Sequence, residues 1–226
     1  MKRIVFLLLG IVIFGMSSCM KPGENIQEFQ FIPAIVDFSM EYGFFLKTDY
    51  AKFVPSGTQD LPGWDDAVLA FFTVNYDQQA SKEYTVVYNF DYMKVDIAAP
   101  RLTAGGPSMT TGYDLPIGDV EILGWVDQIW FFAFAHRDVT KDDLFFYEMS
   151  YDSDEPIVYL RAAKSSSGKV AACAFNMSSF FYRYKDANNK VRFSIQYKSG
   201  VDDEGNDEYK PVVDNYGNST IEITVE

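Results

Sequence analysis

The sequence is poor in the residues on which most metal and catalytic sites depend. It has 226 residues with two cysteines and one histidine, His136. A metal site rich in histidine is therefore excluded, as is a framework of disulfides. A Ser/His/Asp arrangement would have to be built on His136 and the nearby Asp138, and we interpret this pair as part of a solvated turn instead.

Basic residues are scarce too, because 19 Lys and Arg stand against 32 Asp and Glu, a formal net charge of −13 at pH 7. Nucleic-acid binding needs clustered Lys and Arg to neutralise phosphates, so nucleic acid is excluded as a partner. The sequence also has no Gly-rich phosphate loop, no nucleophile elbow and no zinc motif. We therefore predict a protein that is not an enzyme and that binds neither a cofactor nor a metal.

The N-terminus combines positive charge with a short apolar run. Lys2 and Arg3 precede apolar residues 4–16, and Ser17, Ser18 and Cys19 follow. A charged start, roughly 7 to 15 apolar residues and small residues at the cleavage point are typical of a secretory signal peptide. A membrane-spanning helix needs about 20 apolar residues, and this run is shorter. With cysteine first in the mature chain, it resembles a bacterial lipoprotein signal.

Residues 1–18 are thus predicted to be a lipoprotein signal peptide, with Cys19 as the site of lipidation, including palmitate. The lipid would attach the protein to a membrane from outside the cytoplasm. The alternative is an ordinary signal peptide with a chance cysteine, because Met16 stands where such signals usually have leucine.

The rest of the chain has the pattern of β-structure. Aromatic residues make up 17% of the sequence, chiefly Phe and Tyr, which favour strands. Residues 19–27 are polar and are predicted to form a flexible tether. Residues 98–118 hold the densest cluster of Pro and Gly, which predicts a domain boundary. The predicted fold class is all-β: a small OB-like barrel in residues 28–118, followed by an antiparallel β-sandwich in residues 119–226.

Two details of the strand pattern lead to specific expectations. In residues 83–97 the alternation slips by one residue at Tyr92 and Met93, which predicts a β-bulge or a corner there. Within the expected strand 129–136, residues 129–135 are apolar without alternation, which predicts that the strand is covered on both faces. The other expected strands are residues 29–40, 43–50, 67–76, 119–125, 143–151, 157–164, 169–175, 190–198 and 220–226.

Aromatic side chains are the strongest candidates for ligand binding. Tyr88, Phe90 and Tyr92 are expected to share one strand face, and Trp64 stands in a loop rich in Pro and Gly. Barrels of the OB type bind nucleic acids and sugars on stacking aromatic side chains. The alternative for the three strand residues is a place in the barrel core, and for Trp64 it is a structural role.

The acidic residues offer weaker candidates. Paired carboxylates could hydrolyse a glycosidic bond, but the four groups of adjacent acids are typical of turns: Asp65 and Asp66; Asp142 and Asp143; Asp152, Asp154 and Glu155; Asp202, Asp203 and Glu204. Residues 201–209 are predicted to form a solvated hairpin tip, with a calcium site as the alternative. Cys173 lies in an apolar run and is predicted to be a buried, unreactive thiol.

Several segments are similar to those of a known family. Residues 44–50 and 53–56, the strands at 67–74 and 84–94, and the Ser17-Ser18-Cys19 signal resemble the N-terminal OB-type domain of the NigD-like lipoproteins of Gram-negative gut anaerobes. Residues 144–151, 172–180 and 191–197 are similar in layout to the second, β-sandwich domain of that family. The resemblance implies no catalytic residues.

The resemblance also bears on location. Lipoproteins exported to the surface of these bacteria have an acidic cluster after the cysteine, whereas residues 20–24 hold one acid, Glu24. This favours the periplasmic face of the outer membrane over the cell surface. We expect a lipid-anchored, non-enzymatic envelope protein that binds a protein or a glycan. The alternatives are a carbohydrate-active hydrolase that uses paired carboxylates and a subunit of a surface fibre.

Overall fold

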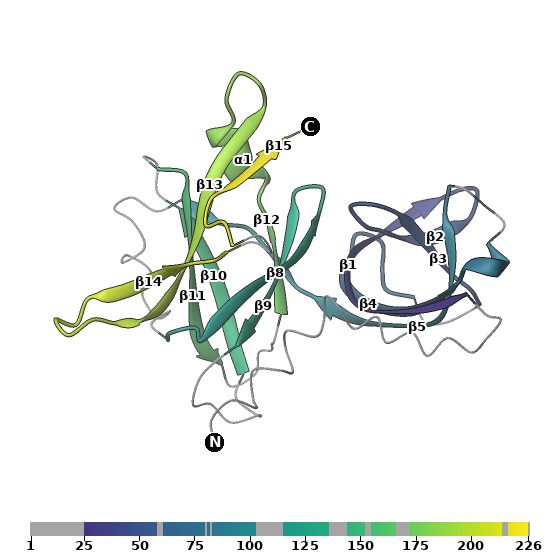
Figure 1. The fold of residues 1–226 in the computed structure, drawn as a ribbon, viewed down its shortest axis with the longest axis horizontal. Coiled ribbons are helices and arrows are strands. Elements are labelled where there is room, and N and C mark those ends of the chain that lie inside the picture. The colour runs from purple at the N-terminus through teal and green to yellow at the C-terminus, as the bar shows by residue number, and fades with distance from the viewer. Residues whose placement is uncertain are drawn as a thin grey trace. The chain divides into compact units, whose positions relative to one another are not determined.

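The structure is a computed structural model that describes residues 25–57, 61–79, 81, 83–102, 115–135, 144–151, 155–165, 172–213 and 217–225. These residues form two compact units that divide between Val95 and Asp96 (Figure 1). Strands dominate both units, so the predicted all-β class is confirmed. The signal peptide, Cys19 and the first part of the tether lie outside the described residues. Within the described ranges, no helix is both long enough and apolar enough to cross a membrane.

The first unit is a closed barrel of five strands in the order β1-β2-β3-β5-β4. Its elements are β1 (Ile26–Ser39), β2 (Gly43–Lys47), β3 (Lys52–Pro55), β4 (Ala67–Asn75), the 3-10 helix η2 (Tyr76–Gln78) and β5 (Thr85–Val95). Neighbouring strands are antiparallel except β3 and β5, which are parallel. The predicted small barrel is therefore present, and its first strand begins at Ile26, within the segment predicted to be a tether.

The barrel core follows from the alternation of the strands. Side chains in a strand point to opposite faces in turn, and every second residue of β4 from Val68 to Val74 is buried in the core. The predicted strand 43–50 is divided in two. Thr48 ends β2 by accepting a hydrogen bond at Oγ1 from the N–H of Ala51, at 3.0 Å, and β3 follows.

The predicted slip in the strand pattern exists, but it lies earlier than expected. Strand β5 has a register shift against β4 between Tyr88 and Asp91, and Asn89 there has a positive φ of 51°. Such an extra residue is a β-bulge, and it exchanges the two faces of the strand. The position of the bulge at Asn89 was not predicted, because an asparagine that points outward is also normal in a regular strand.

The second unit consists of two sheets. One has the order β14-β13-β11-β10-β7, with β15 also paired to β13, and the other has the order β6-β12-β9-β8. The strands are β6 (Ile97–Ala98), β7 (Arg101–Leu102), β8 (Asp119–Val126), β9 (Ile129–Ala135), β10 (Leu144–Tyr151), β11 (Ile157–Ser165), β12 (Ala172–Asn176), β13 (Lys190–Val201), β14 (Asp207–Pro211) and β15 (Ile221–Thr224).

This unit differs from the expected antiparallel sandwich in two respects. Three strand pairs are parallel, β6 with β12, β7 with β10, and β11 with β13, so the sheets are mixed. The unit also begins at Asp96, well before the predicted boundary. The reason is that β6 and β7 are added to the edges of the two sheets.

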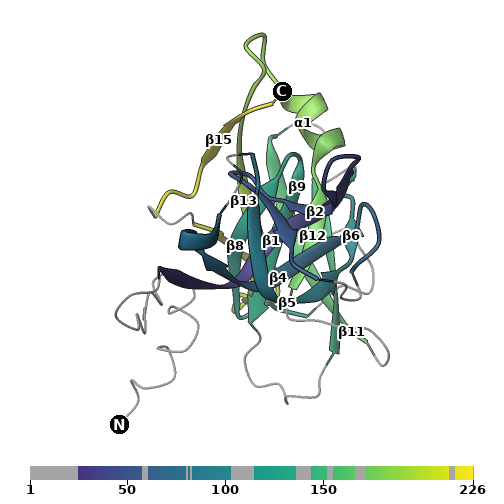
Figure 2. The ribbon, with the colours of Figure 1, turned by 90° about the vertical axis from the view of Figure 1, so that its right-hand side faces the viewer.

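Large aromatic side chains fill the space between the two sheets. Trp130, Phe132 and Phe134 of β9 belong to this core, and Phe131 is buried as well, so β9 is covered on both faces as predicted. The helix α1 (Ser178–Tyr184) was not predicted, and it contributes Phe180 and Phe181 to the core. Helix α1 and strand β15 lie at the same end of the unit (Figures 1 and 2).

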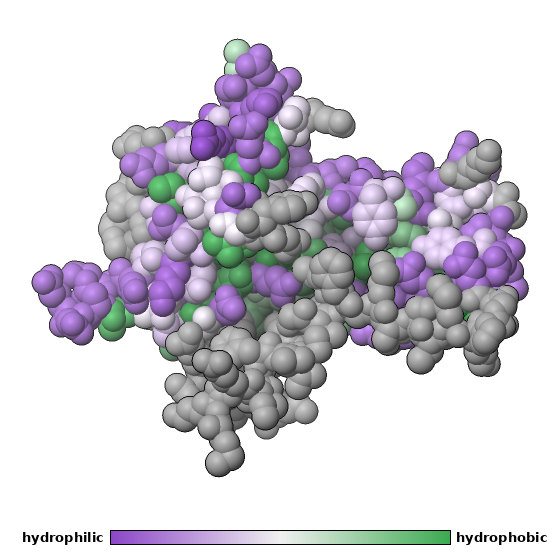
Figure 3. Space-filling model, viewed as in Figure 1, coloured by the Kyte–Doolittle hydropathy of each residue, from purple (hydrophilic) through white to green (hydrophobic). Residues whose placement is uncertain are grey.

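Strands β13 and β14 form a hairpin whose tip carries the acidic loop. Asp202 accepts hydrogen bonds at Oδ1 from the N–H groups of Glu204 and Asn206, at 2.9 and 2.8 Å. The residues of this tip are exposed and hydrophilic (left side of Figure 3). The prediction of a solvated hairpin tip is confirmed for residues 202–206, where the carboxylate of Asp202 closes the turn.

Candidate functional site

The exposed Trp64 is held by a tight turn of residues 63–66. The N–H of Asp66 donates to the carbonyl oxygen of Gly63 at 3.2 Å, and the N–H of Gly63 donates to Oδ2 of Asp66 at 2.8 Å. The other oxygen of Asp66, Oδ1, forms an ion pair with Nζ of Lys94 at 2.7 Å. Asp65 completes the turn with a positive φ of 63°. These contacts hold the backbone on both sides of Trp64, whose side chain remains 66% exposed.

The turn is also attached to strand β1. The N–H of Asp65 donates to the carbonyl oxygen of Val36 at 2.9 Å, and the N–H of Val36 donates to the carbonyl oxygen of Asp66 at 2.9 Å. Val36 is part of the barrel core. Trp64 is therefore presented from a fixed position beside the end of β1.

Phe38 and Phe44 lie across from each other on the hairpin β1–β2. They are register partners, and they follow the core pair Val36 and Leu46 on the same face of the two strands. The two phenyl rings meet edge to face, with centroids 5.3 Å apart. They are 52% and 39% exposed. The apolar inner face of the hairpin thus continues past the core and emerges at the mouth of the barrel.

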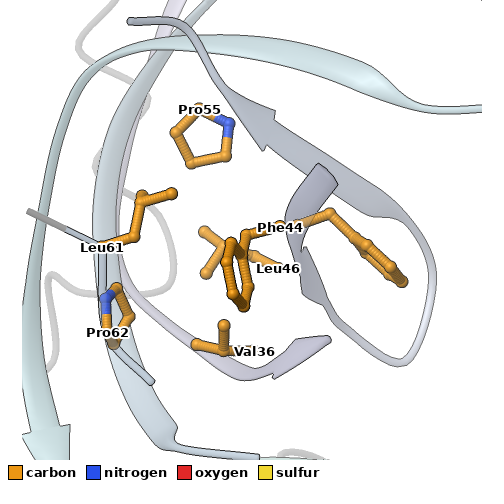
Figure 4. A pocket seen from close by; sticks show the side chains of 7 residues that line it. Val36, Phe44, Leu46, Pro55, Leu61 and Pro62 are labelled. Atoms are coloured by element: carbon orange, nitrogen blue, oxygen red, sulfur yellow. The ribbon is translucent and has the colours of Figure 1, made fainter. Parts of the chain in front are cut away.

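Among the described residues, four line a hollow at this mouth, around a volume of about 220 Å³: Asp37, Phe38, Phe44 and Trp64. A tighter apolar cluster adjoins it through Phe44 and leaves no room for water. Figure 4 shows this cluster, with Leu61 and Pro62 of the loop before Trp64 on one side and Val36 and Leu46 on the other. The hollow therefore borders on tight apolar packing at Phe44.

Asp37 provides the charge of the hollow. Its Oδ1 accepts a hydrogen bond from the N–H of Phe38 at 2.7 Å. Val36 directs its own N–H and carbonyl toward the Trp64 turn, and the N–H of a residue two positions further along a strand points to the same side. The carboxylate that accepts the N–H of Phe38 consequently lies at the edge of β1 that faces Trp64.

The predicted aromatic residues do not come together as expected. Phe90 and Tyr92 face the barrel core and stack on each other with ring centroids 5.7 Å apart. Tyr88 lies on the opposite face of β5, because it is paired with Thr73 on the outward side of β4 and precedes the bulge at Asn89. The expectation of one shared face is wrong. Of the four predicted ligand-binding residues, only Trp64 lines the hollow.

Sequence reasoning missed Phe38, Phe44 and Asp37. All three stand in an apparently ordinary strand, and only the register of the hairpin shows that Phe38 and Phe44 pass beyond the core. The usable signal was their symmetric spacing about the turn at residues 40–42, since residues equally distant from a hairpin turn become partners.

Two of the acidic candidates have structural roles. Asp66 closes the Trp64 turn and binds Lys94, and Asp202 closes the hairpin tip. Among the described residues, no group of three His, Cys, Asp or Glu lies close enough to hold a metal ion. Glu155, Asp203 and Glu204 are exposed residues of the described part of the chain, whereas His136, Asp138, Asp142, Asp143, Asp152 and Asp154 lie outside it.

Cys173 lies on β12, where it is partly buried against the core of the sandwich, rather than fully buried as predicted. Burial raises its pKa well above the ordinary value, and the nearby Asp96 raises it further. Because the thiolate is the reactive form of cysteine, this residue is not suited to nucleophilic chemistry.

The fold and the hollow together define a class of protein: two β-units with an aromatic hollow at the mouth of the barrel. Solved structures with this fold come from Bacteroides and Parabacteroides. An uncharacterized protein from Parabacteroides merdae is 18% identical over 88% of this chain and 99% of its own, with a TM-score of 0.64. A protein named as a lipoprotein, from Bacteroides fragilis, is 13% identical over 88% of this chain and 98% of its own, with a TM-score of 0.56.

The particular resemblance predicted from the sequence is found as well. A NigD-like immunity protein from Bacteroides caccae is 12% identical over 88% of this chain and 98% of its own, with a TM-score of 0.52. The resemblance to NigD-like proteins is thus confirmed as a shared fold. No protein-family model and no curated protein match the sequence.

Proposed function

We propose that this chain is an exported, non-enzymatic protein of the cell envelope that binds a protein or a glycan at the aromatic hollow. The observation that carries this proposal is the hollow itself. Three large aromatic side chains, Phe38, Phe44 and Trp64, remain between 39% and 66% exposed while the backbone around them is firmly hydrogen-bonded. Exposed aromatic side chains on a rigid frame are typical of binding sites, because little entropy is lost when a partner covers them.

The position of the hollow supports the same function. Barrel mouths are common places for ligands, and the five closed strands support an OB-type barrel, a fold that binds oligonucleotides and oligosaccharides. The net charge of −13 disfavours the first of these ligands.

The signal sequence and the neighbours in fold support the proposed location. Cys19 would carry the lipid, and the single acid in residues 20–24 favours the periplasmic face of the outer membrane. A protein named as a lipoprotein and a NigD-like immunity protein share the fold, which supports an envelope location.

Photo-cross-linking in living cells tests the binding site. A benzoylphenylalanine at position 38 should form an adduct with the partner, and the same group at position 182 should not. Tyr182 is a matched control, because it is 78% exposed and lies on α1 of the other unit. The adduct is then identified by mass spectrometry.

Affinity measurements with the purified partner complete the test. Because truncation of a central aromatic side chain in an interface typically costs 2 kcal/mol or more, Trp64→Ala should weaken binding by at least about tenfold. Tyr182→Ala should leave the Kd unchanged. An adduct at both positions, or equal Kd values for the wild type and Trp64→Ala, would show that the hollow is not the binding site.

A further inference from the structure

We infer that the hollow binds a cation, the guanidinium group of an arginine side chain presented by a basic protein partner. This inference rests on the proposed function, and it specifies the chemistry of the same site. It depends on the combination of three aromatic rings with one carboxylate, in a hollow where none of the described lining residues is basic.

The rings favour a cation because the face of an aromatic ring carries partial negative charge. Phe38, Phe44 and Trp64 surround one volume of about 220 Å³. Pockets that bind small-molecule ligands have volumes of about 300 Å³ or more, so this volume is smaller. The hollow therefore suits one side chain, and a planar guanidinium is the cationic group that stacks best on aromatic faces.

The carboxylate of Asp37 provides the matching charge. Oδ1 accepts the N–H of Phe38, and among the described residues Oδ2 has no hydrogen bond or ion pair. Asp65, next to Trp64, also has no ion pair within the described ranges, whereas Lys94 is already bound to Asp66. A guanidinium in the hollow would find an acceptor for its N–H groups and a net charge of opposite sign.

A contact between a cation and an aromatic ring already exists at a neighbouring position in the barrel. Nζ of Lys52 lies 5.5 Å from the centroid of the Phe45 ring and 3.3 Å from the hydroxyl oxygen of Tyr42. Phe45 immediately precedes Leu46 in the same strand as Phe44. The hollow presents a similar aromatic surface without a cation of its own.

Other ligands fit the hollow less well. Among the described residues that line it, only the carboxylate of Asp37 and the indole N–H of Trp64 can form hydrogen bonds from their side chains, so a sugar ring would find few partners for its hydroxyl groups. An apolar side chain would cover the carboxylate of Asp37 without pairing it. An anion would be repelled by Asp37 and by the net charge of −13.

Fluorine NMR of the full-length protein in nonionic detergent tests the inference. The chain has three tryptophans, so 5-fluorotryptophan labelling yields three resonances, and Trp64→Phe identifies that of Trp64. N-acetyl-arginine methylamide should shift the Trp64 resonance in a saturable way. The neutral analogue N-acetyl-citrulline methylamide should bind at least about fivefold more weakly, because it lacks the cationic charge. Trp125 on β8 provides an internal control, since its resonance should not move.

The variant Asp37→Asn separates charge from shape. It should weaken binding of the arginine compound several-fold and leave binding of the citrulline compound unchanged. Equal binding of both compounds, stronger binding of N-acetyl-leucine methylamide or methyl glucoside, or no shift at Trp64 would each overturn the inference.

The inference and the proposed function can fail separately. If Trp64→Ala weakens binding of the cross-linked partner while the arginine and citrulline compounds bind alike, the hollow is a binding site without the proposed cation specificity. If the arginine compound binds through Asp37 but position 38 captures no partner, the cation site stands and the envelope function is wrong.

Discussion

At the scale of single residues, left-handed backbone conformations shape the barrel, and two of them lie at short polar residues. Asp65 has a φ of 63° in the turn that presents Trp64, and Asn89 has a φ of 51° at the bulge of β5. Asp and Asn tolerate this region better than most residues, because their short polar side chains can bond locally. The bulge has the larger consequence, because it turns Tyr88 away from the core and directs Phe90 and Tyr92 into it.

Substitution of Asn89 tests the position of the bulge. Valine is β-branched and disfavours a positive φ, so Asn89→Val should lower the free energy of unfolding by about 1–2 kcal/mol. Urea denaturation measures the change. Asp91→Val, on the same strand and without a positive φ, should have a smaller effect. If both variants lost the same free energy of unfolding, the strain would not lie at Asn89.

At the scale of elements, the hairpin β13–β14 is joined to β11 by buried charges. Asp207 of β14 forms ion pairs with Arg161 of β11 at 3.3 Å and with Lys198 of β13 at 2.5 Å. The two cationic side chains are only 3% and 6% exposed. Such a charge is costly to bury without its partner, so these ion pairs specify where the hairpin lies on the sheet.

Removal of Asp207 should therefore destabilise the second unit. Asp207→Ala leaves two buried cations without their shared carboxylate, and we expect a loss of about 3 kcal/mol in the free energy of unfolding. The control is Glu222→Ala, which breaks the pair of Lys190 and Glu222, whose side chains are 50% and 53% exposed. Exposed pairs contribute little, so the urea midpoint of the control should stay close to that of the wild type. A midpoint for Asp207→Ala that matches the control would contradict this role.

At the scale of the whole molecule, the predicted anchor determines where the hollow can meet a partner. A lipid on Cys19 would hold both β-units near a membrane, while the acidic surface would keep them away from anionic headgroups. The hollow is then available to a basic protein in the same compartment.

The anchor has a direct test. Cys19→Ala should move the protein from the detergent phase to the aqueous phase on Triton X-114 partition, because the acyl chains supply the membrane affinity. Cys173→Ala keeps the signal and should remain in the detergent phase. Mass spectrometry of the wild-type N-terminus should show a lipidated Cys19, and an unmodified terminus at another residue would refute the prediction.

Much of the fold could be predicted because strand alternation is a local property. The strands at 67–76, 129–136 and 190–198 agree closely with β4, β9 and β13. The short strands β6 and β7 could not be predicted, since two residues show no period and their pairing depends on distant strands. Helix α1 was missed because its Phe and Tyr residues also suit a strand.

The sequence by itself determined the all-β class and the acidic net charge, excluded a histidine-rich metal site, and predicts an export signal. Each of these depends on composition or on neighbours along the chain. Only the tertiary structure decided which aromatic side chains meet. Phe38, Phe44 and Trp64 come from a hairpin and a loop, and they converge because the register of β1 with β2 and the hydrogen bonds of Val36 bring them to one end of the barrel. A shift of register by a single residue would direct Phe38 and Phe44 away from the hollow.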